Sequence, residues 1–192
     1  MDDKKALSRW FAETANWFVI FVRTREEQRI ATRLQVKLDE EKYKVFVPTR
    51  DYAHTKNKET TVIKKPLFNG YLFIAATVEA KECLETVEPL FYRDSDIYRL
   101  LSNDTCAESA QLIAKDKAFM VSILDEDFNV PALEAIVEGD WVNVNLDAFA
   151  GTDAKVVRVN KRWQTAEISM FFAGQKTDCE VALEFVIPIR KN

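Results

Sequence analysis

The sequence has little glycine, proline and cysteine, and it has no long apolar run. The 4 Gly and 5 Pro among 192 residues exclude collagen-like and low-complexity chains. No apolar run reaches the roughly 18 residues of a membrane helix, and the N-terminus lacks the apolar core of a signal peptide. We therefore expect a cytoplasmic protein without membrane contact. Its three cysteines, Cys83, Cys106 and Cys179, should be reduced and buried. The alternative is a disulfide between two of them.

The sequence also lacks the motifs of an enzyme or a metal site. Four glycines do not supply a G-x-G-x-x-G or phosphate loop. The one histidine, His54, lies in a polar basic segment without neighbouring cysteines or an acidic cluster. The acidic run at 125–127 has no basic or histidine companion, so we interpret it as solvated. We expect no catalysis, no cofactor and no metal.

Charge divides the chain into a basic and an acidic part. Residues 17–75 carry 12 Lys and Arg against 7 Asp and Glu, whereas residues 76–137 carry 5 against 13. One interpretation is that the basic part meets a polyanion or an acidic partner. The alternative is that solvated faces vary in sign by chance. A net charge of −4 is too acidic for a bulk nucleic-acid binder.

The first part of the chain predicts an α/β sandwich on an antiparallel sheet. The apolar run at 17–22 is typical of a buried strand. Thr24 and Glu27 fit a capping box, which predicts a helix that ends near Tyr43. The elements expected after it are a strand at 45–48, a polar hairpin at 54–65, a turn at Asn69-Gly70, a strand from Tyr71, a helix capped by Thr77, a strand at 91–101 and a helix capped by Thr105 and Glu108.

The last part of the chain predicts a small β-barrel. Residues 125–137 are acidic and weakly periodic, so we interpret them as a linker. From Glu138 onward, four or five short strands are separated by turn residues at Gly151, Asn160 and Gly174. The expected organisation is α+β with two domains: an N-terminal extension at 1–16, the sandwich at 17–124, the linker at 125–137 and the barrel at 138–192.

Aromatic residues concentrate on the expected central strands of the sandwich. They are Phe18, Phe21, Phe68, Tyr71 and Phe73. Strand alternation puts Tyr71 and Phe73 on one face. If no helix covers that face, it is an exposed apolar patch of the kind that binds partners. The alternative is that all of these rings pack in the core.

Five segments, in order, resemble the NusG family of transcription elongation factors. They are Trp17–Ile20 (WFVI), Glu26–Leu34, Val45–Thr49 (VFVPT), Lys65–Phe73 (KPLFNGYLF) and Glu138–Val142 (EGDWV), which opens the family's C-terminal KOW domain. The resemblance covers about residues 17–187 and implies an SH3-like barrel for the C-terminal domain.

The resemblance has departures that point to a specialised paralogue. Asn69 stands where the family has proline, and residues 147–154 lack two of the family's glycines. The closest resemblance is to LoaP-type antiterminators of long biosynthetic operons. The operon-specific RfaH and capsule-locus antiterminators are the alternatives.

The family resemblance implies three interfaces, each with a structural alternative. The clamp helices of RNA polymerase would bind an aromatic set formed by Phe21, Phe68, Tyr71 and Phe73. The alternative is that these rings pack in the core. The non-template DNA strand would meet an arginine set formed by Arg23, Arg25, Arg29, Arg33 and Arg93. The alternative is a solvated helix face on which Glu26 pairs internally. A leader RNA hairpin would bind the KOW turn through Lys155, Arg158, Lys161, Arg162 and Trp163. The alternative is an exposed turn at which Trp163 closes the end of the barrel.

The function that the resemblance implies is regulation of transcript elongation. A monomer would bridge the polymerase cleft, suppress pausing and promote antitermination of a specific operon, with the ribosome or a termination factor as further KOW partners. A housekeeping factor in pausing and termination is one alternative. A ribosome-associated KOW protein that binds rRNA is another, and the net charge of −4 disfavours it.

Overall fold

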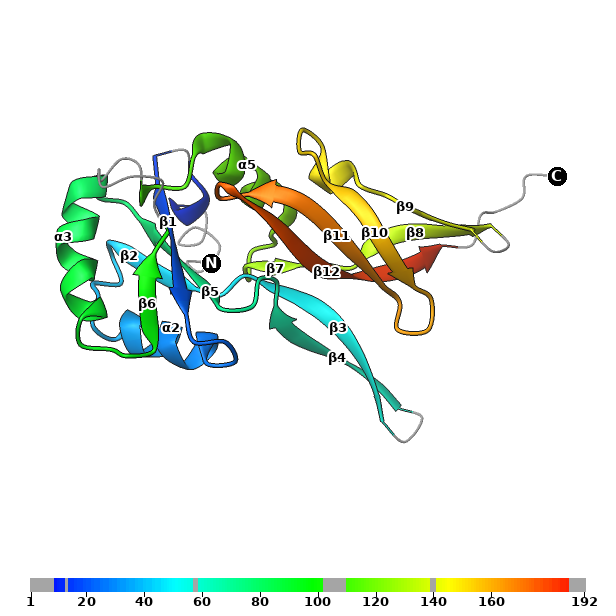
Figure 1. Cartoon of the computed structure of the whole chain (residues 1–192), viewed down its shortest axis with the longest axis horizontal. Helices are drawn as coiled ribbons and strands as arrows, with labels where there is room; N and C mark the ends of the chain where they lie inside the picture. The colour runs from blue at the N-terminus through cyan, green and yellow to red at the C-terminus, as the bar shows by residue number, and fades with distance from the viewer. Residues whose placement is uncertain (1–8, 13, 57–58, 102–109, 139–140, 187–192) are drawn as a thin grey trace. The chain divides into compact units, whose positions relative to one another are not determined.

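A computed structural model of the chain describes residues 9–12, 14–56, 59–101, 110–138 and 141–186. They form two compact units that alternate along the sequence. The first unit takes in the described residues up to Pro48 together with Phe68–Val121, and the second takes in Thr49–Leu67 and the described residues from Ser122 onward. Figure 1 labels their helices and strands.

The first unit is built on an antiparallel sheet of four strands in the order β2-β5-β1-β6 (Figure 1). The amino-acid sequence predicts a strand at each of these places. The last strand is shorter than the predicted 91–101, because α3 continues to Phe91 and turn residues fill the stretch up to Asp96. The four strands are β1 (Asn16–Val22), β2 (Tyr43–Phe46), β5 (Tyr71–Ala76) and β6 (Ile97–Leu100).

Two helices, α2 (Glu27–Gln35) and α3 (Ala80–Phe91), pack on one face of this sheet. Their buried stripes are the ones that helical spacing predicts, with Ile30 and Leu34 on α2 and Cys83 and Val87 on α3. These side chains share one core with alternate residues of the central strands, among them Phe18, Ile20, Leu72 and Ile74.

The predicted helix starts are wrong. α2 begins at Glu27 and α3 begins at Ala80, and neither has a side-chain capping hydrogen bond. Glu27 is buried and accepts a hydrogen bond from the backbone N–H of Gly70, so it does not close a capping box with Thr24. α2 also ends at Gln35 rather than near Tyr43. The predicted cap at Thr105 and Glu108, like Cys106, lies outside the described residues, and the following helix is α5 (Ala114–Ile123).

Residues before β1 belong to the packed structure of the first unit. Trp10 is 3% exposed, and its carbonyl accepts a hydrogen bond from Trp17 Nε1 at 2.8 Å. Lys117 of α5 donates through Nζ to the carbonyl oxygens of Ala12 at 2.7 Å and Ala15 at 2.5 Å. The described end of the predicted N-terminal extension is therefore held by both hydrogen bonds and apolar contacts.

The second unit contains the predicted hairpin, formed by β3 (Thr49–Lys56) and β4 (Glu59–Pro66). The first residues of β3 also pair in parallel with β7 (Asn129–Val130), which makes a three-stranded sheet. Arg50 of β3 is 9% exposed and forms an ion pair with Glu180 at 2.8 Å. The hairpin lies between strands of the first unit in the sequence, yet its contacts place it in the second.

Five further strands of the second unit form a small barrel-like sheet in the order β10-β11-β12-β8-β9 (Figure 1). Among the described strands of this sheet, only the β8–β12 pair is parallel. Their inward residues, such as Ile168, Met170, Val181 and Leu183, are buried. The strands are β8 (Leu133–Glu138), β9 (Trp141–Val144), β10 (Lys155–Asn160), β11 (Thr165–Phe172) and β12 (Gln175–Val186), with a 3-10 turn at Asp147–Phe149.

The segment at 125–137 differs from the irregular linker that the sequence analysis expects. It contains β7 and all but the last residue of β8. β8 pairs with both β9 and β12, so it is an integral strand of the barrel. The domain boundaries themselves stay a prediction.

Candidate functional site

The face of the first sheet that α2 and α3 leave free carries the aromatic residues. In the register of β1 and β5, Phe21 stands opposite Tyr71, and Val19 stands opposite Phe73. Because side chains alternate along a strand, these residues lie on the face opposite the helix-covered core. Tyr71 and Phe73 therefore share one face of the sheet, as strand alternation predicts.

Burial separates this aromatic set into two parts. Phe73 has no exposed area and Phe68 is 4% exposed. The Phe73 ring lies 5.6 Å from that of Phe46, 6.5 Å from that of Phe68 and 6.3 Å from that of Trp17, measured between centroids. The expectation of an exposed patch is therefore wrong for Phe68 and Phe73, because these rings pack against one another. Polymerase binding by the set stays a prediction.

The reachable part of the aromatic face lies at Phe21 and Tyr71. Both are half-buried, and their ring centroids are 5.3 Å apart. Tyr98 of β6, which the sequence analysis does not name, lies 5.2 Å from the Phe21 ring and is 53% exposed. Its position inside a predicted strand with interposed charges is the only signal that could have identified it.

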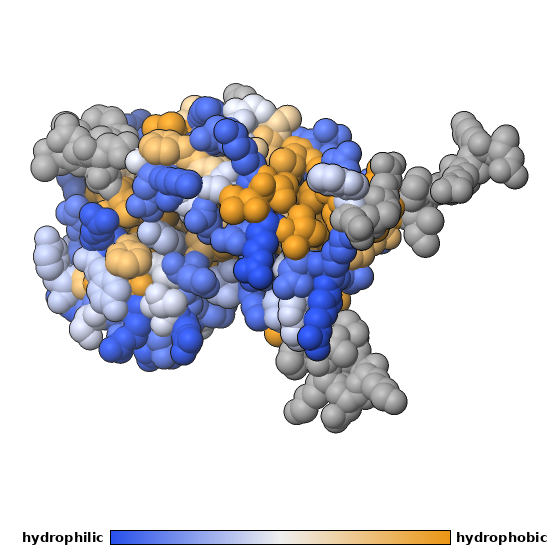
Figure 2. All heavy atoms as spheres, turned by 45° about the vertical axis from the view of Figure 1, so that its right-hand side comes forward, coloured by the Kyte–Doolittle hydropathy of each residue, from blue (hydrophilic) through white to orange (hydrophobic). Residues whose placement is uncertain are grey.

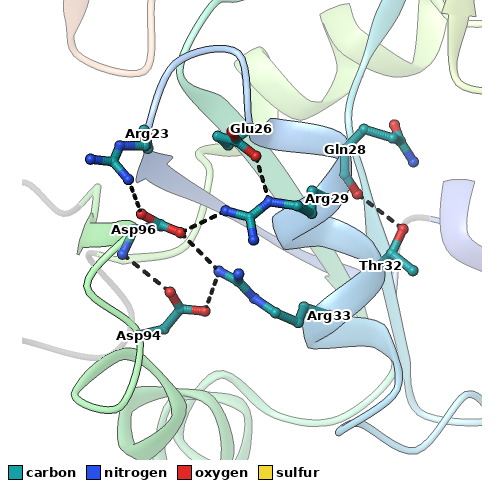
Figure 3. A network of polar contacts seen from close by, with 8 residues as sticks. All are labelled: Arg23, Glu26, Gln28, Arg29, Thr32, Arg33, Asp94 and Asp96. Atoms are coloured by element: carbon teal, nitrogen blue, oxygen red, sulfur yellow. Dashed lines mark hydrogen bonds and ion pairs between the residues drawn. The ribbon is translucent and has the colours of Figure 1, made fainter.

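Three of the five predicted DNA-contacting arginines converge on one carboxylate (Figure 3). Asp96, just before β6, accepts hydrogen bonds from Arg23 at 2.8 Å, from Arg29 at 3.0 Å and from Arg33 at 3.4 Å. Arg33 also pairs with Asp94 at 2.5 Å. The internal pair expected with Glu26 is present as well, with Arg29 Nε donating to it.

The arginines hold Asp96 in its ionised form. Partial burial of the carboxylate would raise its pKa, but the hydrogen bond from Arg33 and the positive charges of Arg23, Arg29 and Arg33 together lower that pKa below its ordinary value. The cluster therefore presents guanidinium groups that are oriented and partly neutralised. Arg23 and Arg29 still expose 60% and 56% of their side chains.

The other two arginines of the set differ from these three. Arg25 is exposed in the loop before α2 and has a positive φ of 73°. Arg93 is exposed between α3 and β6, not on a strand as predicted. Within the part of the chain that the structure describes, neither forms an ion pair. Both therefore have charges available to a polyanion.

The predicted RNA-binding residues lie along β10 and in the turn that follows it. All five are exposed, and Trp163 is 40% exposed. The Arg162 guanidinium lies 5.5 Å from the centroid of the Trp163 ring, within range of a cation–π contact. A register shift between Val156 and Arg158 leaves Val157 and Arg158 both exposed. The structure thus arranges the set along one strand and its turn: Lys155, Arg158, Lys161, Arg162 and Trp163.

Exposed apolar side chains are also frequent in the second unit, and Figure 2 shows hydrophobic side chains gathered on one face of the molecule. Large exposed apolar residues of this unit include Trp141 at 82%, Val157 at 61% and Phe171 at 58%.

Among the described residues, no group of three or more His, Cys, Asp and Glu is placed to hold a metal ion. None of the described helices is long and apolar enough to cross a membrane. His54 has no described side chain.

Residues 15–115 match a protein family, NusG, described as transcription termination factor nusG. Among solved structures, one described as "Domain interaction in Thermotoga maritima NusG" is similar at 13% identity and a TM-score of 0.54, over 88% of this chain and 94% of that one. This likeness shows the fold, and it confirms the predicted α+β class with a small SH3-like barrel. No curated protein sequence matches the chain.

Proposed function

Since the chain belongs to the NusG family, whose members are transcription elongation factors that bind RNA polymerase, we propose that it bridges the polymerase cleft, suppresses pausing and promotes antitermination of a specific operon. The observation that carries this proposal is the family match over residues 15–115, a range that also holds the aromatic face and the arginine cluster. A bridge that binds only the closed polymerase shifts the population toward that state. This action requires neither a reaction nor a cofactor.

The polymerase contact is proposed for the reachable edge of the aromatic face. Phe21 and Tyr71 are half-buried neighbours on the two central strands. A small aromatic patch can carry most of the energy of an interface. Phe68 and Phe73 would not touch the clamp helices. As buried rings they would hold the strands that carry Phe21 and Tyr71 in place.

The DNA contact is proposed for the arginine cluster beside α2. Arg25 and Arg93 carry unpaired charge among the described residues, and Arg23 and Arg29 remain more than half exposed. A guanidinium can pair with a phosphate through two donors. The non-template strand of the transcription bubble offers such phosphates.

The operon-specific part of the proposal depends on the KOW turn. Lys155 and Arg158 are exposed without an ion pair in the described structure, and Arg162 lies over the Trp163 ring. Cations beside an exposed aromatic ring suit a looped RNA, in which phosphates and unstacked bases are both accessible. A leader RNA hairpin is therefore the proposed ligand, as in LoaP-type factors.

The polymerase contact is tested by co-purification. Tyr71→Glu should abolish binding of the full chain to RNA polymerase, while circular dichroism shows an unchanged fold. Tyr92→Glu is the matched control, because Tyr92 is 88% exposed in the same unit. Unchanged binding by a folded Tyr71→Glu protein would contradict the assignment.

The effect on transcription is tested by reading through a terminator in vitro. The full chain should increase read-through when the template begins with the leader of the neighbouring operon, and less so with an unrelated leader. Equal effects on both leaders would favour a housekeeping-type factor. Binding to rRNA without any effect on polymerase would favour the ribosomal alternative.

A further inference from the structure

A β-bulge at the start of β6 gives Tyr98 an unusual position. Along β1 and β6, Phe21 pairs with Arg99, but the next residue, Val22, pairs with Ile97. Tyr98 is therefore an extra residue without a partner on β1. Bulges re-aim side chains and are frequent beside functional sites.

The bulge changes which side chains of β6 face solvent. In a regular strand, neighbouring side chains point to opposite faces. Here Tyr98 and Arg99 are both exposed, while Ile97 is 6% exposed in the core. An aromatic ring and a guanidinium group are thereby presented together at the surface.

Tyr98 contacts one aromatic ring, and two arginines lie close to it along the chain and its strand partner. Its ring lies 5.2 Å from that of Phe21, with an angle of 59° between the planes. Arg23 follows Phe21 by two residues, and both its backbone N–H and its guanidinium donate to Asp96, two residues before Tyr98. Arg99 has no ion pair within the described residues, so its charge is not neutralised.

We propose that Tyr98 is a stacking site for an unpaired base of a DNA strand whose phosphates meet Arg23 and Arg99. The inference rests on the DNA contact of the proposed function and adds a residue that reads bases rather than phosphates. An exposed ring beside cations is the combination with which proteins hold single strands, because every base offers a π-face. Duplex DNA does not offer this contact, since its bases are already stacked.

The positive charge beside the ring favours a nucleic-acid strand over an apolar protein surface. A protein partner would bury Arg99 and would need a carboxylate to pair with it. A phosphate next to the stacked base supplies that negative charge without a further requirement. Binding of the ring to polymerase is the outcome that would replace the inference.

The experiment measures binding of the full chain to a short, labelled oligodeoxythymidine by fluorescence anisotropy at several salt concentrations. Tyr98→Ala should weaken binding by about fivefold to a hundredfold without changing the salt dependence. Tyr98→Phe should bind as wild type, because the ring is kept. Phe171→Ala should also bind as wild type, because Phe171 is 58% exposed on β11 of the second unit, which carries no proposed DNA contact. Arg99→Gln should reduce the slope of log affinity against log salt concentration by about 0.7, the value for one lost phosphate contact on a single strand.

Two further measurements make each outcome decisive. On an oligonucleotide with abasic sites, wild type and Tyr98→Ala should bind equally, because no base is left to stack. If Tyr98→Ala disturbs folding, Tyr98→Leu keeps an apolar contact to Phe21 and should show the same loss. Wild-type binding of oligodeoxythymidine by a folded Tyr98→Ala protein overturns the inference alone. Absence of any oligonucleotide binding by the wild type at low salt overturns the proposed DNA contact, whereas polymerase co-purification tests the rest separately.

Discussion

The backbone N–H of Gly70 donates a hydrogen bond to the buried carboxylate of Glu27, 2.6 Å away. This bond connects the first residue of α2 to the turn that leads into β5. The carbonyl of Gly70 in turn accepts a hydrogen bond from the backbone N–H of Val22 at 2.8 Å. One glycine thereby fixes the end of β1, the start of α2 and the start of β5 relative to one another.

Gly70→Ala is expected to destabilise the chain more than Gly151→Ala. Both glycines have left-handed backbones, with φ of 81° and 82°, and a side chain there costs about 1–3 kcal/mol. At Gly70 a Cβ would also stand 3.1 Å from Cε2 of Phe21, whereas at Gly151 it would meet nothing within 4 Å. Urea unfolding of both variants measures the difference. Equal losses would show that crowding at Gly70 is relieved by small shifts.

The Glu27–Gly70 bond also shows why the helix start was mispredicted. Thr24 and Glu27 have the spacing of a capping box, which is a local pattern. The actual partner of Glu27 lies 43 positions along the chain. A local pattern does not reveal a contact that only the assembled sheet brings together.

Local periodicity was sufficient for the elements with one buried face. Apolar residues at helical spacing, Ile30 and Leu34 on α2 and Cys83 and Val87 on α3, form the core faces of both helices. The β-rich pattern after Glu138 likewise predicted the barrel. It did not identify β8, because the strand at Leu133–Glu138 follows an acidic segment with a proline.

The sequence indicates the internal pair of Arg29 with Glu26, but not the pairing of Arg33 with Asp94 or the burial of Phe73. The family resemblance indicates Arg29 and Arg33, which lie four residues apart on one helix face, but the carboxylates that orient them follow α3. Phe73 was assigned to the correct face of the sheet, but its burial depends on rings from other segments. Tyr98 depends on the register between two strands, which no single strand encodes.

Phe73→Ala should destabilise the first unit far more than Tyr71→Ala. Phe73 is fully buried, and replacing a buried phenylalanine by alanine typically costs about 3–5 kcal/mol. Tyr71 is only half-buried, so its loss should cost clearly less. Chemical unfolding measures both. Similar costs would mean that Tyr71 is also a core residue, and its proposed polymerase contact would then need another explanation.

Asp96→Asn should lower stability at neutral pH and have less effect in acid. The folded-state pKa of Asp96 is lowered from the ordinary value of 3.8. A lowered pKa contributes stability that is present above the ordinary value and is lost as the pH falls through the folded-state value. The difference in unfolding free energy between wild type and variant should therefore be constant near neutrality and shrink below about pH 4. A difference that does not depend on pH would show that the arginines do not stabilise the ionised carboxylate.

The buried cysteines should resist alkylation in the native protein. Burial raises the pKa of the Cys83 and Cys179 thiols to about 12 each, and the thiolate is the reactive form. Iodoacetamide at neutral pH should modify neither residue until denaturant is added, as mass spectrometry of peptides would show. Rapid native labelling of Cys83 would mean that α3 opens readily from the sheet.

Trp163→Ala should weaken binding of the full chain to a leader RNA hairpin without changing its salt dependence. A base stacked on the ring would contribute about 1–3 kcal/mol, and removing the ring removes no charge. Arg162→Ala should weaken binding and also reduce the salt slope, because a phosphate contact is lost with its counterion release. Trp141→Ala is the matched control, since Trp141 is 82% exposed on β9 of the same barrel. Fluorescence anisotropy with a scrambled hairpin as a second ligand measures all three variants. If the wild type does not prefer the leader hairpin, or if Trp141→Ala weakens binding as much as Trp163→Ala, the RNA site does not lie on this turn.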